Sequence, residues 1–246
     1  MTGVIVAAVL VVAAVGLSAA TRMGLERELV LAAVRAAVQL TVVGAIIAVV
    51  FEHAGLAWAF VAVMLGAASF TSGRRLRGAP RATVRAAAAI ALGAAAAIVP
   101  LLATGAFDTR PRELIPIAGI LIGGAMVATS VTGRRLIDRA EEDRAGVEAR
   151  LALGASVPEA LAPTVRQAVT TAMIPILDQT KNVGLVTLPG TFVGLILGGA
   201  TPAEAARVQL TVLLALLAVE LVAALAAARL TVAGLRAPGE RVVIRP

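Results

Sequence analysis

Residues 3–20 read GVIVAAVLVVAAVGLSAA, an apolar run that contains no charged side chain. As a helix this run would rise about 27 Å, close to the roughly 30 Å hydrocarbon core of a bilayer. A helix on the surface of a soluble protein would show a polar face at a period of about 3.6 residues, and this run has none. Residues 86–102, AAAAIALGAAAAIVPLL, have the same character. Both stretches therefore predict helices that cross a membrane.

The apolar residues of this 246-residue chain are gathered in blocks rather than spread evenly. They make up 59% of the sequence, above the roughly 45–50% that is usual for soluble domains. A spanning helix needs about 20 mostly apolar residues, and seven blocks meet that requirement: 3–20, 29–51, 54–72, 83–105, 113–133, 184–200 and 208–230. The expected fold class is all-α: a polytopic integral membrane protein with about seven transmembrane helices in a single domain, 1–246.

The distribution of positive charge predicts which way the helices face. Eighteen Lys or Arg residues lie in the connections after the first, third and fifth blocks, at the C-terminal end, or at the block edges beside them (Arg85 and Arg229), against three in the other connections. In membrane proteins, the connections on the cytoplasmic side carry the excess of Lys and Arg. We therefore expect the N-terminus on the outer side of a cell membrane and the C-terminus on the cytoplasmic side. The net charge of +7 then reflects topology rather than binding to nucleic acid. A secretory signal peptide carries its positive charge before the apolar run. Arg22 and Arg27 instead follow the first block, so we expect that block to be a retained helix.

The longest polar interruption, 134–183, is expected on the cytoplasmic side, and its middle encodes a turn between two helices. Gly154 suits the position after a helix end, because glycine tolerates a positive φ. Ser156 and Glu159 have the spacing of a capping box, and Pro158 in the first turn costs no hydrogen bond. We therefore predict a rigid cytoplasmic elbow over residues 148–162. Two prolines after it are expected to bend or break the chain before it re-enters the bilayer: Pro163 and Pro175.

The sequence of this elbow, EARLALGAS from residue 148, resembles the E-A-A-x-x-x-G loop of ABC-transporter permeases. In that family the loop forms a coupling helix that docks on the ATP-binding subunit, and about two spans follow it. Arg150 stands where the family pattern has its second alanine. The resemblance, with the capping box, assigns ATPase coupling to Glu148, Ala149, Leu153, Gly154, Ala155, Ser156 and Glu159.

Three longer stretches narrow the resemblance to the iron-export permease family, which includes bacterial Fet-type exporters and plant aluminium-tolerance permeases. They are VRAAVQLTVVG (34–44), VEARLALGASVPEAL (147–161) and IPILDQTKNVGLVTLPGTFVGLILGGATPAEAARVQ (174–209). Gly123-Gly124 stands where the family pattern leads us to expect Gly-Asn. The resemblance implies the permease subunit of an ABC exporter of iron or another metal, partnered by separate ATP-binding subunits. The chain has no G-x-x-x-x-G-K-[ST] loop, so ATP would be bound by the partner and no cofactor by this chain. Seven helices are few for an alternating-access pore, so we expect a homodimer.

Small residues at four-residue spacing mark two candidate packing faces. Such spacing lets helix backbones approach closely, and the glycines concerned are Gly119, Gly123, Gly190, Gly194 and Gly198. They serve either packing within the chain or a surface that meets a second copy or lines the pathway. Pro189, just before the second set, is expected to kink or unwind the start of its helix.

Ionisable and amide side chains inside or beside the apolar blocks are the pathway candidates. Glu220 lies halfway along the last block, where an unpaired carboxylate costs a few kcal/mol, so it either contacts cargo or a proton or makes a structural hydrogen bond. Arg35 and Gln39 share a helix face and either line the pathway or bond between helices. Asp178 and Asn182 either meet a hard cation or form a solvated helix end.

Two other classes of function are alternatives to an ATP-driven permease. A proton-coupled secondary transporter that uses Glu220 is one rival, and a membrane scaffold that transports nothing is another. Neither HExxH nor GxSxG occurs, so no catalytic residue is expected. The chain has no cysteine and one histidine, which excludes a thiolate metal site or a His-rich cage within one copy. A resident metal site is therefore not expected.

Overall fold

The computed structural model describes residues 2–76, 80–239 and 241–243. Arg77 and Arg245, which the charge distribution above includes, lie outside these described residues. The contacts divide the chain into two compact units, Met1–Ala54 and Gly55–Pro246. Nearly all of the described chain is helical, as the sequence predicts.

The first unit is a pair of helices, α1 (Thr2–Ala20) and α2 (Glu26–Glu52), which pack against each other. The Ser18 hydroxyl donates to Glu26 Oε1 at 2.7 Å and accepts the Leu25 backbone N–H at 3.1 Å. The turn between the helices includes Gly24 at a φ of +72°, a conformation that glycine adopts without strain. One buried serine therefore ties the end of the first helix to the start of the second.

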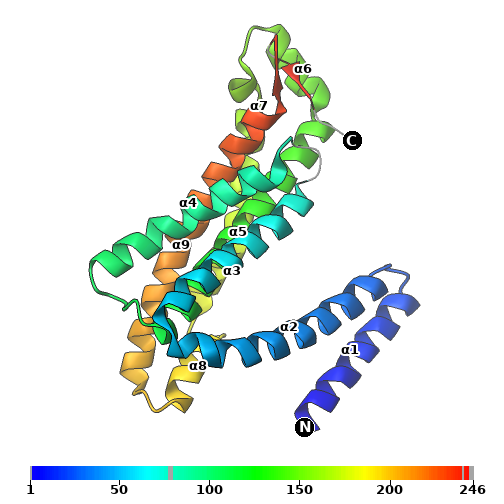
Figure 1. Ribbon diagram of the computed structural model, residues 1–246. Helices are drawn as coiled ribbons and strands as arrows, with labels where there is room; N and C mark the ends of the chain where they lie inside the picture. Colours follow the sequence, from blue (N-terminus) through cyan, green and yellow to red (C-terminus); the bar gives the residue numbers. More distant parts are fainter. Residues whose placement is uncertain (1, 77–79, 240, 244–246) are drawn as a thin grey trace. The chain divides into compact units, whose positions relative to one another are not determined.

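The second unit is a bundle with α9 at its centre, packed against α4, α5, α7 and α8. Figure 1 shows α6 and the two short strands together at the end of this bundle, where α5 and α9 finish and α7 begins. Its elements are α3 (Ala54–Arg75), α4 (Ala82–Ala103), α5 (Pro111–Glu142), α6 (Arg144–Ala152), α7 (Val157–Asn182), α8 (Gly190–Leu197), α9 (Pro202–Leu235), β1 (Arg236–Ala237) and β2 (Arg241–Val242). The two strands pair antiparallel as a hairpin.

Six helices in the described part of the chain are long and apolar enough to cross a membrane: α1, α2, α3, α4, α5 and α9. The protein is therefore a multi-pass membrane protein, as predicted. The predicted span over 184–200 is wrong. Within it only α8, with 8 residues, is helical, and a helix of that length rises about 12 Å, too little to cross the hydrocarbon core.

Most of the polar stretch 134–183 is helical, and the prediction that its two prolines bend or break the chain is wrong where it expects a break. Helix α5 continues to Glu142, and α7 runs for 26 residues through both Pro163 and Pro175 without a break. Its buried residues recur every three or four positions, so one face packs against α5 and α9. They are Val157, Ala160, Leu161, Thr164, Ala168, Ala172, Met173 and Ile176. The gain from this buried face holds the helix together across its prolines.

Close approach of helices in the bundle depends on glycines at particular crossings. A Cβ added to Gly93 on α4 would lie 2.7 Å from the Ala223 Cβ and 2.9 Å from the Val219 carbonyl oxygen of α9. Backbone atoms cannot move aside as the end of a flexible side chain can, so this crossing has no room for a methyl group. Gly66 on α3, by contrast, faces open space.

Replacing Gly93 by alanine is expected to lower the free energy of unfolding by about 1–3 kcal/mol, the usual cost of overpacking. The matched variant Gly66→Ala should be neutral or stabilising by up to about 1 kcal/mol, because alanine favours a helix. Thermal unfolding in detergent, followed by circular dichroism, measures both. Equal melting temperatures for the two variants would contradict the tight crossing.

Candidate functional site

The elbow between α6 and α7 begins with a helix end of defined geometry. Gly154 has a φ of +92°, as expected for the glycine that ends a helix. The Ala155 N–H donates to the Arg150 carbonyl at 3.1 Å, and the Gly154 N–H donates to the Leu151 carbonyl at 3.0 Å. These two bonds form a Schellman motif, which satisfies the last carbonyls of α6.

The second half of the elbow is the N-terminus of α7. The Ser156 backbone N–H and hydroxyl both donate to Glu159 Oε2, at 2.8 and 2.6 Å. Ser156 and Glu159 form the predicted capping box, and Pro158 lies in the first turn. The helix–turn–helix prediction is therefore confirmed, with both helix ends closed by local hydrogen bonds.

Arg150 joins the two halves, and sequence reasoning missed this role. Its guanidinium donates to the carbonyls of Gly146 and Ala160, each at 2.9 Å, and makes an ion pair with Asp143. The side chain is 31% exposed, so much of this fork is screened from water. It connects the end of α5, the first turns of α6 and the start of α7. The seven-residue spacing from Asp143 to Arg150 is a faint signal of this contact in the sequence.

The two faces of the elbow differ in character. Leu153 at the apex is 88% exposed, and Ala149 and Glu148 are exposed on the helix before it. Glu148 accepts a hydrogen bond from Arg144 Nε at 2.9 Å, and this bond raises the pKa of the Arg144 guanidinium. On the inner face, buried Val147 packs in a cluster with α7 and α9. The elbow is thus anchored on one side and open on the other.

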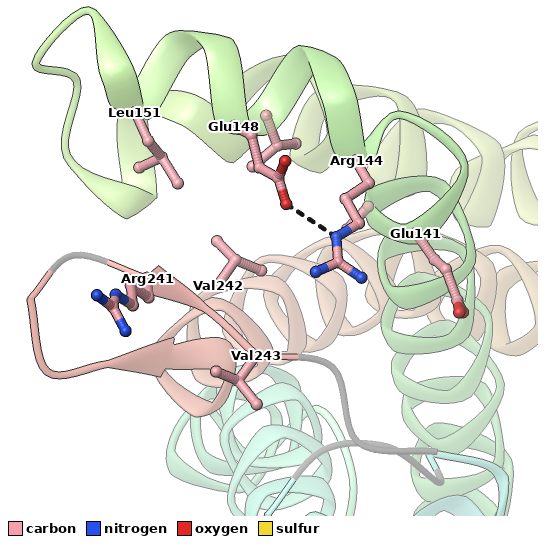
Figure 2. Close-up of a pocket in the computed structure, with 9 residues that line it drawn as sticks. Glu141, Arg144, Glu148, Leu151, Arg241, Val242 and Val243 are labelled. Atoms are coloured by element: carbon pink, nitrogen blue, oxygen red, sulfur yellow. Dashed lines mark hydrogen bonds and ion pairs between the residues drawn. The ribbon is translucent and has the colours of Figure 1, made fainter.

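A groove of about 490 Å³ separates α6 from the terminal hairpin. Figure 2 shows Arg144, Glu148 and Leu151 of α6 on one side of it and strand β2 with Arg241 and Val242 on the other. The groove places charged and apolar groups beside the coupling residues that the sequence predicts. Seven of those residues, from Glu148 to Glu159, are therefore brought to one end of the bundle.

Glu220 is buried inside the bundle, with 7% of its surface exposed. It lies on α9 at the crossing with α5, where a Cβ added to Gly124 would be 2.9 Å from Glu220 Oε1 and 2.6 Å from Leu216 Cδ2. Gly124 therefore lets the carboxyl group rest against the backbone of α5. Gly123 faces open space instead, so the two adjacent glycines differ in role.

The other predicted pathway residues belong to elements other than α9. Arg35 and Gln39 are on α2 in the first unit, where both are exposed. Asp178 and Asn182 are exposed in the last turns of α7, and the Asn182 amide donates to the Asp178 carbonyl at 2.9 Å. Among the described residues, no three His, Cys, Asp or Glu side chains are placed to hold a metal ion.

Most of the predicted packing glycines have free space beside them. A Cβ at Gly123, Gly190 or Gly194 would meet nothing within 4 Å, and one at Gly119 would make an ordinary contact with Met64. A Cβ at Gly198 would meet carbonyl oxygens of its own helix. Helix α8 begins directly after Pro189. The glycines that do hold described helices close are others: Gly73, Gly93, Gly124 and Gly133.

Comparisons with known proteins place the chain among its relatives. A rice protein (Oryza sativa subsp. japonica), "UPF0014 membrane protein STAR2", is 41% identical over 211 residues, 85% of this chain and 74% of that protein. "Protein ALUMINUM SENSITIVE 3" of Arabidopsis thaliana is 37% identical over 84% of this chain and 77% of its own length. "Probable iron export permease protein FetB" of Escherichia coli (strain K12) is 32% identical over 92% of this chain and 88% of that protein.

No solved structure matches the chain. The model of one family, described as "Uncharacterised protein family (UPF0014)", matches residues 1–235, which include the first unit, the elbow and the second unit to the end of α9. The resemblance seen in the elbow and in residues 174–209 is therefore confirmed along nearly the whole sequence. The protein is a multi-pass membrane protein of the UPF0014 family.

Proposed function

We propose that this chain is the permease subunit of an ATP-driven exporter, and that it is coupled through the 148–162 elbow to a separate ATP-binding subunit. Two copies and two ATP-binding subunits form the working complex. Hydrolysis in the partner moves the elbow and switches the pathway between inward-open and outward-open states. The chain itself needs no ATP site in this scheme.

The observation that carries this proposal is the construction of the elbow. A connection that only links two helices needs neither a Schellman motif, nor a capping box, nor a half-buried arginine fork that joins both helices. This one has all three, and it ends in Leu153, an apolar side chain that is 88% exposed. An exposed leucine on a rigid support suits a pocket on a partner protein, because the few side chains that fill desolvated pockets carry most of the binding energy at interfaces. The elbow is therefore suited to transmit a movement of the partner protein to the helices of the bundle.

The membrane path in this proposal includes α7 as a seventh crossing. Its 26 residues would rise about 39 Å, enough to span a bilayer, and it packs along α5 and α9. With α7 in place of 184–200, the elbow and the C-terminus remain on the cytoplasmic side and the N-terminus outside. Asp178 and Asn182 then lie near the outer surface. We treat residues 1–246 as one permease domain, because the family match extends through both units.

The proposed homodimer gives a role to the apolar surface near α8. Leu185 and Leu197 are 91% and 83% exposed, and Gly190 and Gly194 have open space beside them. Apolar side chains next to bare glycine backbone suit close contact with another helix in a membrane. A second copy of the chain is the partner that this proposal assigns to them.

The proposed cargo is iron, another metal or a metal complex. The support is the similarity to a protein named as a probable iron export permease. The chain has no cysteine, so a transient cargo site would use oxygen donors, which suit hard cations. Glu220 inside the bundle and Asp178 near the outer surface are the carboxylates proposed to contact the cargo at different points of its path.

ATP hydrolysis by a candidate ATP-binding-cassette partner tests this function, with the partner and this chain reconstituted in liposomes. Wild type is expected to stimulate hydrolysis, and Leu153→Asp is expected to reduce the stimulation about tenfold, since losing an interface anchor costs about 1.4 kcal/mol or more. The control is Met23→Asp, which changes an exposed apolar side chain in the turn between α1 and α2. If the partner neither binds wild type nor changes its hydrolysis rate in response, the proposed coupling through the elbow is wrong.

A proton-coupled carrier remains the second candidate because Glu220 is buried within a bundle of apolar helices. Intramembrane carboxylates are typical of proton relays. This alternative predicts transport that needs no ATP-binding partner and that stops when the pH gradient is removed. A membrane scaffold, the third candidate, predicts a partner that binds without any change in its hydrolysis rate.

A further inference from the structure

A second groove, distinct from the one beside α6, lies where α7 begins and α9 ends. Its volume is about 530 Å³. The apolar lining residues come from both helices: Pro158, Ala162, Val165, Val232 and Ala233. Three arginines complete the lining: Arg166, Arg229 and Arg236. The groove therefore combines an apolar wall with concentrated positive charge.

The lining of this groove contains no Asp or Glu. Neither Arg166 nor Arg229 makes an ion pair or side-chain hydrogen bond with any described residue. The basic groove beside Arg74 and Arg75 differs, because Asp138 lines it. The groove between α7 and α9 thus presents guanidinium groups that are available to an anion.

In the proposed orientation, the position of these arginines along the chain places them at the membrane surface. Arg229 lies at the end of the apolar block 208–230, and Arg166 precedes the apolar part of α7. Arg166 is nine residues from Val157, or about 14 Å along the helix, and Arg229 is about 9 Å from the end of α9. Long basic side chains at such positions reach the headgroup layer. The groove therefore opens where lipid phosphates lie.

We propose that the groove between α7 and α9 binds one anionic phospholipid of the inner leaflet. The phosphate accepts hydrogen bonds from Arg166 and Arg229, whose planar guanidinium groups match phosphate oxygens. An acyl chain lies along Val165 and Val232. Basic grooves between membrane helices on the cytoplasmic side are typical sites for anionic headgroups. This inference rests on the proposed orientation and is independent of transport and of any ATPase.

A bound lipid here would connect the first turns of α7 to the last turns of α9. Pro158 lies in the first turn of α7, directly after the Ser156 cap of the elbow. The lipid would thus contact the helix that supports the elbow, beside the face formed by its buried residues. A bilayer poor in anionic lipid would leave Arg166 and Arg229 in one groove without an anionic partner, which is unfavourable.

Native mass spectrometry of the full chain in detergent tests the proposal, with phosphatidylglycerol and phosphatidylcholine as probes. Wild type is expected to retain one phosphatidylglycerol in preference to phosphatidylcholine. The double variant Arg166→Gln/Arg229→Gln should bind it at least tenfold more weakly, since each basic residue near an anionic surface contributes about a factor of five. The matched control is Arg74→Gln/Arg75→Gln, which removes the same charge from the groove that contains Asp138 and should leave binding unchanged.

A third variant tests the apolar wall without changing the charge. Ala233 is exposed in the groove, so Ala233→Phe should fill it and displace the acyl chain while the fold is kept. Retention of phosphatidylglycerol by both the Gln variant and the Phe variant would overturn the site. Equal competition by soluble glycerol 3-phosphate would also overturn it, because the ligand would then be a free phosphate. A self-association of wild type that both variants abolish would instead assign the groove to a second copy of the chain.

Discussion

Replacing Arg150 by alanine is expected to reduce the stimulation of the partner ATPase about thirtyfold while the bundle stays folded. The change removes two hydrogen bonds to backbone carbonyls and the ion pair with Asp143. Charge-assisted bonds contribute about 1.5–3 kcal/mol each, and partial exposure reduces the total to about 2 kcal/mol. A looser elbow spends less time in the geometry that the partner binds, so apparent affinity falls in proportion.

The matched control for this prediction is Arg144→Ala on the same helix. Arg144 forms only an exposed ion pair with Glu148, with 77% of its side chain in solvent, and such pairs contribute little to stability. Arg150→Lys should restore only part of the stimulation, because a lysine cannot form the same fork. ATPase rates measured against partner concentration separate affinity from turnover. If Arg150→Ala behaves like wild type, or if Arg144→Ala is equally impaired, the fork does not couple the two proteins.

Glu220→Gln is expected to reduce cargo transport by about 10–100-fold without loss of folding. The amide keeps the size of the side chain, and it removes the negative charge that would bind a cation or carry a proton in the proposed role, an interaction of about 1.5–3 kcal/mol. Transport into inside-out vesicles that contain the partner, with ATP and ferrous or ferric iron, measures the effect. Unchanged transport would assign Glu220 to structure alone.

The adjacent glycines of α5 provide a paired test of the same site. Gly124→Ala places a methyl group against Glu220 Oε1 and Leu216 Cδ2, so it should displace the carboxyl group and reduce transport as well. Gly123→Ala meets nothing within 4 Å and should leave transport unchanged. Both positions are in one helix and differ by one residue, so helix propensity is matched. If the two variants transport equally, the position of the Glu220 carboxyl group does not matter for transport, and Glu220 is not part of the pathway.

What the sequence predicted correctly depends on short-range rules. The long apolar blocks identify six of the described helices as membrane spans, because hydropathy averages over neighbouring residues. Gly154 and the pair Ser156–Glu159 predicted the elbow, because helix ends are closed by groups within four residues. The resemblance at the elbow and over 174–209 identified the family for a similar reason, since each motif is contiguous.

Only the tertiary structure decided which helix follows the elbow through the bundle. Hydropathy missed α7 because its apolar residues lie on one face, at three- and four-residue spacing, while Gln167, Thr170 and Thr171 dilute the average. The prolines at 163 and 175 indicated a break when read locally. Burial against α5 and α9 outweighs that local cost, and burial depends on partners far away in sequence.

The contacts of the candidate site have the same origin. In the sequence, Arg150 is only a departure from a family pattern. Its role follows from the fold, because α7 brings the Ala160 carbonyl within hydrogen-bond distance of its guanidinium. Gly124 is needed because Glu220, almost a hundred residues away, packs against it, and Gly93 is needed because Val219 does. By itself the sequence determined that this protein crosses the membrane many times and carries a capped elbow. Which glycine, which arginine and which polar helix matter was decided by packing, because packing joins residues that no local pattern relates.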